Sequence, residues 1–266
     1  MVKQKLEGVS ETLLIPLWAR AVETKRPEPI IRDELAVQMM EKLDYDFAKF
    51  EKARLSQVGV AIRTELLDKA VTAFLAKQAE AVVVNLGCGL DTRFFRVDNG
   101  RVHWYDLDLP EPIRLRRQFF SETDRYRMLE KSVFDPSWPQ AIQRGDRPVL
   151  IIAEGLLMYF TEPEIKELLA RLAGEFPQAE MLFEILSPLL VKNSRRHDSV
   201  SKTDASFQWG VVSGKMVEAL HENIRFLEEW NYFDYHRNRW GWFGWLALIP
   251  AGKRYFNNKI AHLQFV

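Results

Sequence analysis

Ala81-Val82-Val83-Val84-Asn85-Leu86-Gly87-Cys88-Gly89-Leu90-Asp91-Thr92-Arg93 is the stretch that decides the fold of this chain. It begins with a short apolar run rich in β-branched residues, which is typical of a parallel strand buried on both faces. The run ends at Gly87-Cys88-Gly89, where a chain that leaves a strand can turn tightly and let a ligand approach its backbone. The stretch therefore predicts a buried strand followed by a ligand-binding turn.

An acidic residue completes this pattern. His103-Trp104-Tyr105-Asp106-Leu107-Asp108 predicts a second strand, and Asp108 lies 19 residues beyond Gly89. At about this spacing a carboxylate reaches the ribose hydroxyls of a nucleotide bound at the first loop. The glycine loop alone is a weak signal, but the loop together with Asp108 favours a nucleoside site. Asp106 in the same strand is the second candidate carboxylate.

The loop does not complete the dinucleotide fingerprint. Thr92 stands where a third glycine would allow close helix–strand packing around a pyrophosphate. The chain also lacks a Tyr-x-x-x-Lys pair. Both features count against an NAD-type oxidoreductase, which is the leading alternative of another class, and leave S-adenosylmethionine (SAM) open. A protein that binds SAM without catalysis is a third possibility.

Composition narrows the class of protein further. The 266 residues include 37 basic and 37 acidic side chains, so overall charge does not suggest a nucleic-acid partner. The five histidines have no metal-ligand spacing, so we expect no metal site. A single cysteine, Cys88, suits a reducing compartment, and no apolar run approaches the length of a membrane span. We expect a soluble cytoplasmic protein that does not interact with membranes.

The remaining pattern predicts a doubly wound, Rossmann-like α/β fold with a seven-stranded sheet. Residues 1–80 are expected to form an N-terminal helical cap, and residues 81–266 the ligand-binding domain, with a lid at about 188–217. A helix from Thr161 to about Ala173 has a capping box and stops at Gly174. The basic helix after Pro110 is expected to expose its arginines. Further strands are expected at Tyr126–Val133, Pro148–Ala153, Glu180–Leu186, Arg225–Tyr235 and Lys259–Val266, the last two as an antiparallel pair at the sheet edge.

The sequence resembles the leucine carboxyl methyltransferase family. The resemblance rests on Asn85–Arg93 followed by Tyr105–Pro110, and extends through Thr12–Arg20, Ile152–Tyr159 and Asn258–Leu263. It therefore covers nearly the whole chain, and it is strongest to the bacterial branch of tetracenomycin polyketide synthesis O-methyltransferases. The resemblance implies a SAM-dependent O-methyltransferase on a Rossmann-like sheet.

The resemblance also implies roles for individual residues. SAM would lie over Gly87 and Gly89, with Asp108 on its ribose. Arg63, just off the apolar stripe of its helix, matches an arginine that contacts the SAM carboxylate, a strong bidentate pairing. The assignments that complete the cofactor site are Glu154, Ser132, Val133 and Arg20. Glu154 would be an unusual residue inside a buried strand, which independently favours a place at the strand tip facing the cleft.

The methyl acceptor is expected to be a small molecule with a carboxylate or hydroxyl oxygen. Tyr159 matches a family tyrosine near the acceptor group, and it is the candidate catalytic residue. In the protein-methylating branch, an acidic residue and an arginine stand where this chain has Ser132 and Phe134. Phe134 would offer an apolar surface to an aromatic or polyketide-like acceptor, and a protein C-terminal carboxylate remains the alternative acceptor. The oligomeric state is left open.

The aromatic patch Trp240–Pro250 has three possible interpretations. It could pack over the sheet, form a wall of the substrate pocket, or contact a membrane surface. Eleven residues are too few to span a bilayer, so the patch is not a transmembrane segment.

Overall fold

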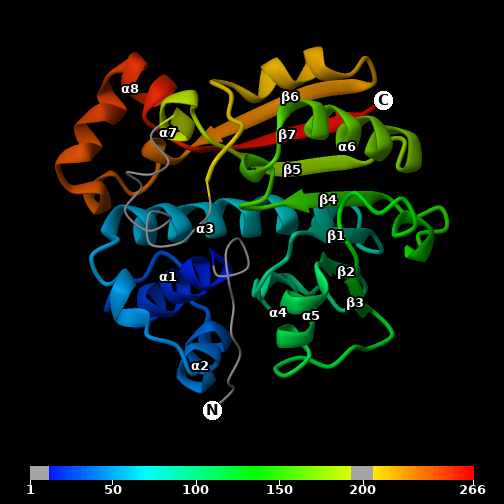
Figure 1. The fold of residues 1–266 in the computed structure, drawn as a ribbon, viewed down its shortest axis with the longest axis horizontal. Helices are drawn as coiled ribbons and strands as arrows, with labels where there is room; N and C mark the ends of the chain where they lie inside the picture. The colour runs from blue at the N-terminus through cyan, green and yellow to red at the C-terminus, as the bar shows by residue number, and fades with distance from the viewer. Residues whose placement is uncertain (1–11, 193–205) are drawn as a thin grey trace.

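Seven strands form one mixed sheet in the computed structural model, which describes residues 12–192 and 206–266 (Figure 1). The five strands in the order β3-β2-β1-β4-β5 are parallel, whereas β7 runs antiparallel to both of its neighbours, β5 and β6. The predicted antiparallel pair at the sheet edge is thus confirmed. Across the sheet the strands are β3 (Tyr126–Glu130), β2 (His103–Asp108), β1 (Val82–Leu86), β4 (Val149–Ala153), β5 (Glu180–Ile185), β7 (Lys259–Phe265) and β6 (Ile224–Asn231).

Helices cover both faces of the sheet. The α-helices are α1 (Leu14–Thr24), α2 (Glu34–Lys42), α3 (Arg54–Lys77), α4 (Arg93–Val97), α5 (Pro110–Arg116), α6 (Glu162–Glu175), α7 (Pro188–Lys192) and α8 (Pro250–Tyr255). Short 3₁₀ helices are η2 (Phe47–Phe50), η3 (Pro139–Ala141), η4 (Leu157–Tyr159), η7 (Gly214–Leu220), η8 (Tyr232–Asp234) and η9 (Arg237–Leu248). No described helix has the length and apolar character that a membrane crossing requires.

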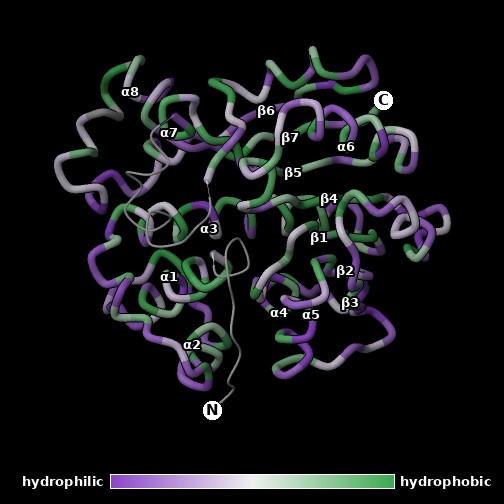
Figure 2. The backbone as a smooth tube through the Cα atoms, viewed as in Figure 1, coloured by the Kyte–Doolittle hydropathy of each residue, from purple (hydrophilic) through white to green (hydrophobic). Residues whose placement is uncertain are grey.

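Alternate residues of the central strands face two separate cores. Val83 and Leu150 pack with residues of α1 to α5, whereas Val84 and Ile151 pack with residues of α6 on the opposite face. The side chains of all five β1 residues are buried, as expected of a strand covered on both sides. Figure 2 shows hydrophobic residues along β1 and β4 and hydrophilic residues on many outer turns. The predicted doubly wound α/β fold is confirmed.

The layout of the sheet creates a ligand-binding position. β1 lies between β2 and β4, and the chain after β1 enters α4 on one face while the chain after β4 leads to α6 on the other. Loops that diverge in this way leave a crevice at the carboxyl ends of the two strands, where open α/β sheets bind their ligands. The N-terminal helices add a wall to this crevice, because α1 packs on α3 and α3 contacts α4.

Several predicted element boundaries need correction. The third strand ends at Glu130 instead of Val133, so Ser132 and Val133 lie in the loop that follows. The capping box of α6 is present, but Gly174 lies inside the helix, which ends at Glu175. The predicted lid at about 188–217 includes α7, but residues 193–205 lie outside the described residues, and the lid remains a prediction.

The predicted solvated face of the helix after Pro110 is wrong at one residue. Arg114 and Arg117 are exposed, but Arg116 is only 1% exposed. Its guanidinium pairs with Asp106 and donates a hydrogen bond of 3.0 Å to the main-chain oxygen of Gly89. A buried charge is tolerated only with such partners. The local sequence pattern of the helix does not reveal that Asp106 of β2 is the partner of Arg116.

Candidate active site

A cavity of about 430 Å³ lies at the carboxyl ends of β1, β4 and β5. The glycine loop after β1, the segment Glu154-Gly155-Leu156 after β4, and Glu184 near the end of β5 all line it. Residues of α1, α3, η8 and η9 close the other sides. The cavity therefore occupies the crevice that the sheet topology creates.

The glycine loop has a backbone that requires glycine. Gly87 and Gly89 have φ values of +62° and +47°. A Cβ atom at Gly87 would lie 2.7 Å from Cδ1 of Leu156, so a side chain there would also clash with the segment after β4. The loop keeps its backbone open to the cavity for these reasons.

Asp108 folds back onto the glycine loop. Its Oδ2 accepts a hydrogen bond of 2.7 Å from the Gly89 N–H, and its Oδ1 accepts one of 2.7 Å from the Leu109 N–H. Burial raises the pKa of this carboxyl above its usual value despite the two hydrogen bonds. Asp108 also lines the cavity. The structure therefore places Asp108 beside the glycine loop, as the spacing in the sequence predicts.

Asp106 is placed differently from Asp108. Its side chain is 1% exposed and accepts hydrogen bonds from the hydroxyl of Tyr126 over 2.7 Å and from Nδ2 of Asn85 over 3.1 Å. The guanidinium of Arg116 completes its surroundings. Asp106 is absent from the described cavity wall, so Asp108 is the carboxylate available to a ligand.

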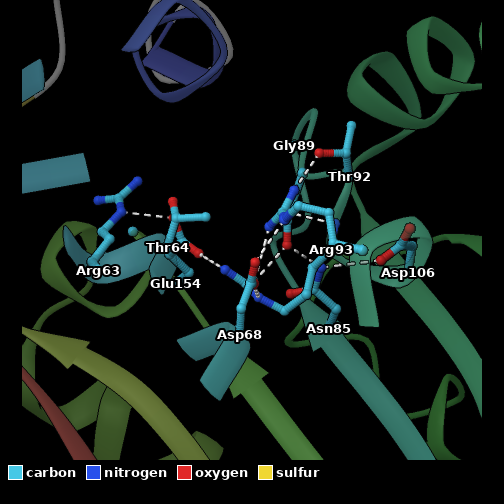
Figure 3. Close-up of polar contacts among 12 residues, drawn as sticks. Arg63, Thr64, Asp68, Asn85, Gly89, Thr92, Arg93, Asp106 and Glu154 are labelled. Atoms are coloured by element: carbon cyan, nitrogen blue, oxygen red, sulfur yellow. Dashed lines mark hydrogen bonds and ion pairs between the residues drawn. The ribbon is translucent and has the colours of Figure 1, made fainter. Parts of the chain in front are cut away.

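Arg63 and Glu154 lie together in the cavity wall. Nε of Arg63 donates to Oε1 of Glu154 over 2.6 Å, and Nη2 of Arg93 donates to Oε2 of Glu154 over 2.6 Å. Figure 3 shows the Glu154 carboxylate between the two guanidinium groups. Burial opposes ionisation, but these cations hold the pKa of Glu154 below its usual value.

Arg93 belongs to a larger ion-pair network behind the cavity. Its side chain is fully buried and also pairs with Asp68 over 2.8 Å and Asp91 over 2.6 Å. Arg96 pairs with Asp68 over 2.7 Å, and with Asp33 over 3.1 Å. We call Arg20, Asp33, Asp68, Asp91, Arg93, Arg96 and Glu154 the ion-pair network. It joins the N-terminal helices to the loop after β1 and the end of β4.

Arg20 is, with Glu154, one of two members of this network that the sequence assigned to the cofactor. It lines the cavity, but its Nε donates to Oδ2 of Asp33 over 2.8 Å and its Nη2 donates to the Leu90 carbonyl over 2.8 Å. Its side chain is 2% exposed. These contacts hold the glycine loop against α1, and the direct role in cofactor binding stays a prediction.

Tyr159 lies in η4 and lines the cavity. Its ring centroid is 5.6 Å from that of Phe207. Burial raises the pKa of Tyr159 above its usual value, so its hydroxyl stays protonated at neutral pH. A protonated phenol in this position can donate a hydrogen bond but cannot accept a proton as a base.

Ser132, Val133 and Phe134 do not line the cavity. Val133 is buried in the core on the α6 face, and the Ser132 hydroxyl accepts a hydrogen bond from the Phe134 N–H over 3.2 Å. The ring centroid of Phe134 is 4.8 Å from that of Phe160. The cofactor roles of Ser132 and Val133 stay predictions, but the expected acceptor surface at Phe134 needs correction.

Aromatic side chains from other elements form the wall that Phe134 was expected to supply. Trp240 packs edge-on against Phe233 with ring centroids 5.0 Å apart. Trp242 and Trp245, in contrast, are each 71% exposed, so the aromatic patch divides between cavity wall and surface. The aromatic residues that line the cavity are Tyr159, Phe207, Tyr232, Phe233, Trp240, Phe243 and Phe256.

Sequence reasoning missed two charged residues of this site. Arg93 was not assigned to the cofactor site, and Glu184 was quoted only as part of the fifth strand. Glu184 interrupts the apolar run of β5, and the argument that placed Glu154 at a strand tip applies to it equally. That signal could have found Glu184.

Comparisons with known proteins identify the family of this chain. Residues 14–173 match the family model described as leucine carboxyl methyltransferase. The chain is 36% identical over 231 residues to the tetracenomycin polyketide synthesis O-methyltransferase TcmP of Streptomyces glaucescens, which covers 86% of this chain and 85% of that protein. This chain belongs to the leucine carboxyl methyltransferase family.

Another relative and two solved structures are also similar to this chain. The SAM-dependent methyltransferase dpfgK of Gibberella zeae is 29% identical, over 92% of this chain and 89% of its own. A Streptomyces avermitilis protein of known structure has a TM-score of 0.58 at 13% identity, with 94% and 97% of the two chains covered. Magnesium protoporphyrin IX methyltransferase of Synechocystis, solved with bound SAH, has a TM-score of 0.52 at 10% identity, covering 88% and 94%.

Membership of the leucine carboxyl methyltransferase family settles the class of enzyme. The protein is a SAM-dependent O-methyltransferase, and the NAD-type alternative is set aside. The low identities of the solved structures support the fold alone.

Proposed function

We propose that this O-methyltransferase methylates an oxygen atom of a small aromatic molecule. The observation that carries the proposal is the mixed lining of the cavity. Its charged side chains and open backbone come mainly from α3 and the carboxyl ends of β1, β2, β4 and β5, whereas most of its aromatic rings come from η4, η8 and η9. Pockets for small molecules combine apolar walls with a few polar groups in this way.

The part of the cavity near the glycine loop fits SAM. Gly87 and Gly89 would let the cofactor approach the backbone, and Asp108 would accept hydrogen bonds from its ribose hydroxyls. Arg63 would bind the carboxylate of the cofactor, because guanidinium and carboxylate pair strongly. Glu154 would lie near the ammonium group or the sulfonium. Each proposed partner has the charge or hydrogen-bonding character that the corresponding part of SAM requires.

The aromatic part of the cavity fits a flat acceptor. Trp240, Phe233 and Phe243 come from η8 and η9, and Tyr159 and Phe207 complete the wall. Rings of this kind bind other aromatic rings through stacked or edge-on contacts worth about 0.5–1.5 kcal/mol each beyond burial. The relative TcmP is named for polyketide synthesis, which is consistent with an aromatic or polyketide-like acceptor here.

The residues of this chain would act mainly by alignment. SAM supplies a methyl group on a positively charged sulfur, and an oxygen nucleophile can displace that sulfur. A carboxylate acceptor is already nucleophilic, so binding both reactants in a dry cavity is enough to favour the reaction. The protonated Tyr159 would donate a hydrogen bond that orients the acceptor. It is therefore the residue we propose to contact the reacting group.

We propose that the acceptor is a small molecule and not a protein C-terminus. We also propose that the enzyme is cytoplasmic. The first is supported by the aromatic side chains of the cavity wall, among them Phe233, Trp240 and Phe243. The second rests on a single cysteine, Cys88, whose thiol is buried and whose pKa burial raises.

A labelled-methyl transfer screen tests the proposal. The protein is incubated with labelled SAM and aromatic carboxylic acids, phenols, or a peptide that ends in leucine. We expect label to be transferred to one or more aromatic compounds and not to the peptide. Efficient methylation of the peptide with no aromatic compound accepted would overturn the proposal.

A further inference from the structure

Glu184 is a buried carboxylate between apolar neighbours in β5. Both of its neighbours in β5, Phe183 and Ile185, are buried in the core on the α6 face, and Glu184 itself is 1% exposed. An ionised carboxylate in such surroundings is costly unless donors surround it. The donors that the structure provides show what Glu184 does.

Each oxygen of Glu184 has two donors. Oε2 accepts from Nη1 of Arg63 over 2.8 Å and from the Gly155 N–H over 3.1 Å. Oε1 accepts from the hydroxyl of Tyr232 over 3.0 Å and from Nδ2 of Asn258 over 3.3 Å. These donors come from α3, the segment after β4, η8, and the residue before β7. Glu184 thus connects four segments that line the cavity.

Arg63 is held by two carboxylates at once. Glu154 binds its Nε and Glu184 binds its Nη1. The β4–β5 pairing aligns Ala153 with Phe183, so these two carboxylates come next on neighbouring parallel strands. Like charges so placed repel each other unless a cation lies between them, and Arg63 is that cation.

One nitrogen of the Arg63 guanidinium is left for a ligand. Within residues 12–192 and 206–266, Nη2 of Arg63 has no hydrogen-bond partner, and Arg63 lines the cavity. A guanidinium has five N–H donors in a rigid plane, so fixing Nε and Nη1 also fixes the direction of Nη2. The two glutamates therefore set which way Arg63 presents its available donors.

We propose that Glu184 is a positioning residue for the cofactor: it orients Arg63 so that the guanidinium binds the carboxylate of SAM. This inference rests on the proposed role of Arg63. Glu184 acts through Arg63 and does not contact the reacting atoms. Its effect should therefore be confined to ligands that carry the amino-acid part of SAM.

The test compares two ligands with the Glu184→Gln variant. SAM carries the amino-acid part, whereas 5′-methylthioadenosine has the adenosine and the sulfur without it. We expect Glu184→Gln to raise the Kd of SAM about tenfold or more, because a hydrogen bond to a charged group is weakened. The Kd of methylthioadenosine should change less than about twofold, which is the pattern of a purely local effect.

The substitution is mild enough to test the charge. The new amide oxygen can keep the contacts to Arg63 and Gly155. The new amide nitrogen can donate to Oδ1 of Asn258, which is buried without a partner among the described residues, if the Asn258 amide turns over. Glu180→Gln is the matched control, because Glu180 begins the same strand and pairs with His262 away from the cavity. It should leave both Kd values unchanged.

Two outcomes would overturn the inference. An equal loss of affinity for both ligands would mean that Glu184 only supports the fold, and an unchanged Kd for SAM would mean that it does not act on Arg63. If Glu184→Gln does not fold, Tyr232→Phe replaces it. That variant removes one donor to Glu184 and should weaken SAM binding by a smaller factor, again without an effect on methylthioadenosine.

Arg63→Lys separates this inference from the proposed function. If Arg63→Lys does not weaken SAM binding, the assignment of the SAM carboxylate to Arg63 fails, and the inference about Glu184 fails with it. If Arg63→Lys weakens SAM binding but Glu184→Gln does not, only the role of Glu184 fails. The binding experiments need no acceptor, so an unsuccessful acceptor screen does not affect them.

Discussion

The proposed cofactor and acceptor parts of the cavity differ in the side chains that form them. In the cofactor part, buried ions hold one another: Glu154 contacts two arginines, and Arg93 contacts three carboxylates. In the acceptor part, rings such as Phe233 and Trp240 pack on each other with few polar contacts. A network of buried ions is rigid because moving any member leaves a charge unpaired. Aromatic packing tolerates changes of shape more easily. The difference suits a constant cofactor in one part and a family-specific acceptor in the other.

The largest expected effect is on stability and comes from the ion-pair network. Arg93→Met would leave Asp68, Asp91 and Glu154 without their shared cation in a buried site. Breaking buried pairs costs about 3–5 kcal/mol, so the free energy of unfolding should fall by that amount in urea titrations. Arg117→Met is the control, because the Arg117–Glu130 pair is exposed and worth about 0–1 kcal/mol. Equal losses in the two variants would contradict the special role of the network.

A second prediction separates the two carboxylates of β2. Asp108→Ala should weaken SAM binding by about 1–3 kcal/mol, because it removes charge-assisted hydrogen bonds to the ribose. Asp106→Asn should mainly lower the melting temperature, because Asp106 is buried beside Arg116 and away from the cavity. Calorimetric titration and thermal unfolding measure the two effects. A folded Asp108→Ala protein with normal SAM affinity would refute the ribose assignment.

A third, smaller effect is expected in the acceptor part of the cavity. Phe243→Ala removes part of the aromatic wall and should raise the KM of the best acceptor found in the screen by about fivefold, or about 1 kcal/mol. The Kd of SAM should not change, because Phe243 belongs to the acceptor part. Trp242→Ala is the matched control, since Trp242 is its neighbour but is exposed. If both variants raise the KM of the acceptor equally, Phe243 has no special role, and the acceptor also contacts exposed aromatic residues.

The smallest effect concerns pH. Burial raises the pKa of Asp108 above 3.8, whereas the arginines lower the pKa of Glu154 below 4.5. Because the pKa of Asp108 is raised, this carboxyl gains its proton at a higher pH than an ordinary aspartate does, and SAM affinity should begin to fall there as the pH decreases. Asp108→Asn should remove this dependence, which titrations at a series of acidic pH values can measure. If the SAM affinity of Asp108→Asn still falls at acidic pH, another titrating group causes the pH dependence.

The strands, the glycine loop and the place of Asp108 beside it could be predicted from local sequence pattern, because each depends on residues that are close in sequence. The apolar run of β1 and the spacing from Gly89 to Asp108 need no knowledge of distant contacts. The errors at Arg116 and the omission of Glu184 have the opposite cause. Arg116 is buried because α5 packs so that its guanidinium meets Asp106, ten residues earlier in β2, and Glu184 depends on Arg63, which is 121 residues away. Charged residues whose partners lie on another element look like surface residues until the fold brings the two elements together.

Our proposal places the cofactor and the acceptor side by side in one cavity, so that both can bind at once. The most direct test measures the Kd of the unreactive product SAH by calorimetry, with and without a saturating amount of the best acceptor from the screen. We expect SAH and the acceptor to bind together, so that the Kd of SAH stays the same or decreases. A Kd for SAH that rises in proportion to acceptor concentration would mean that the two compete for one position, and that the cavity does not hold both.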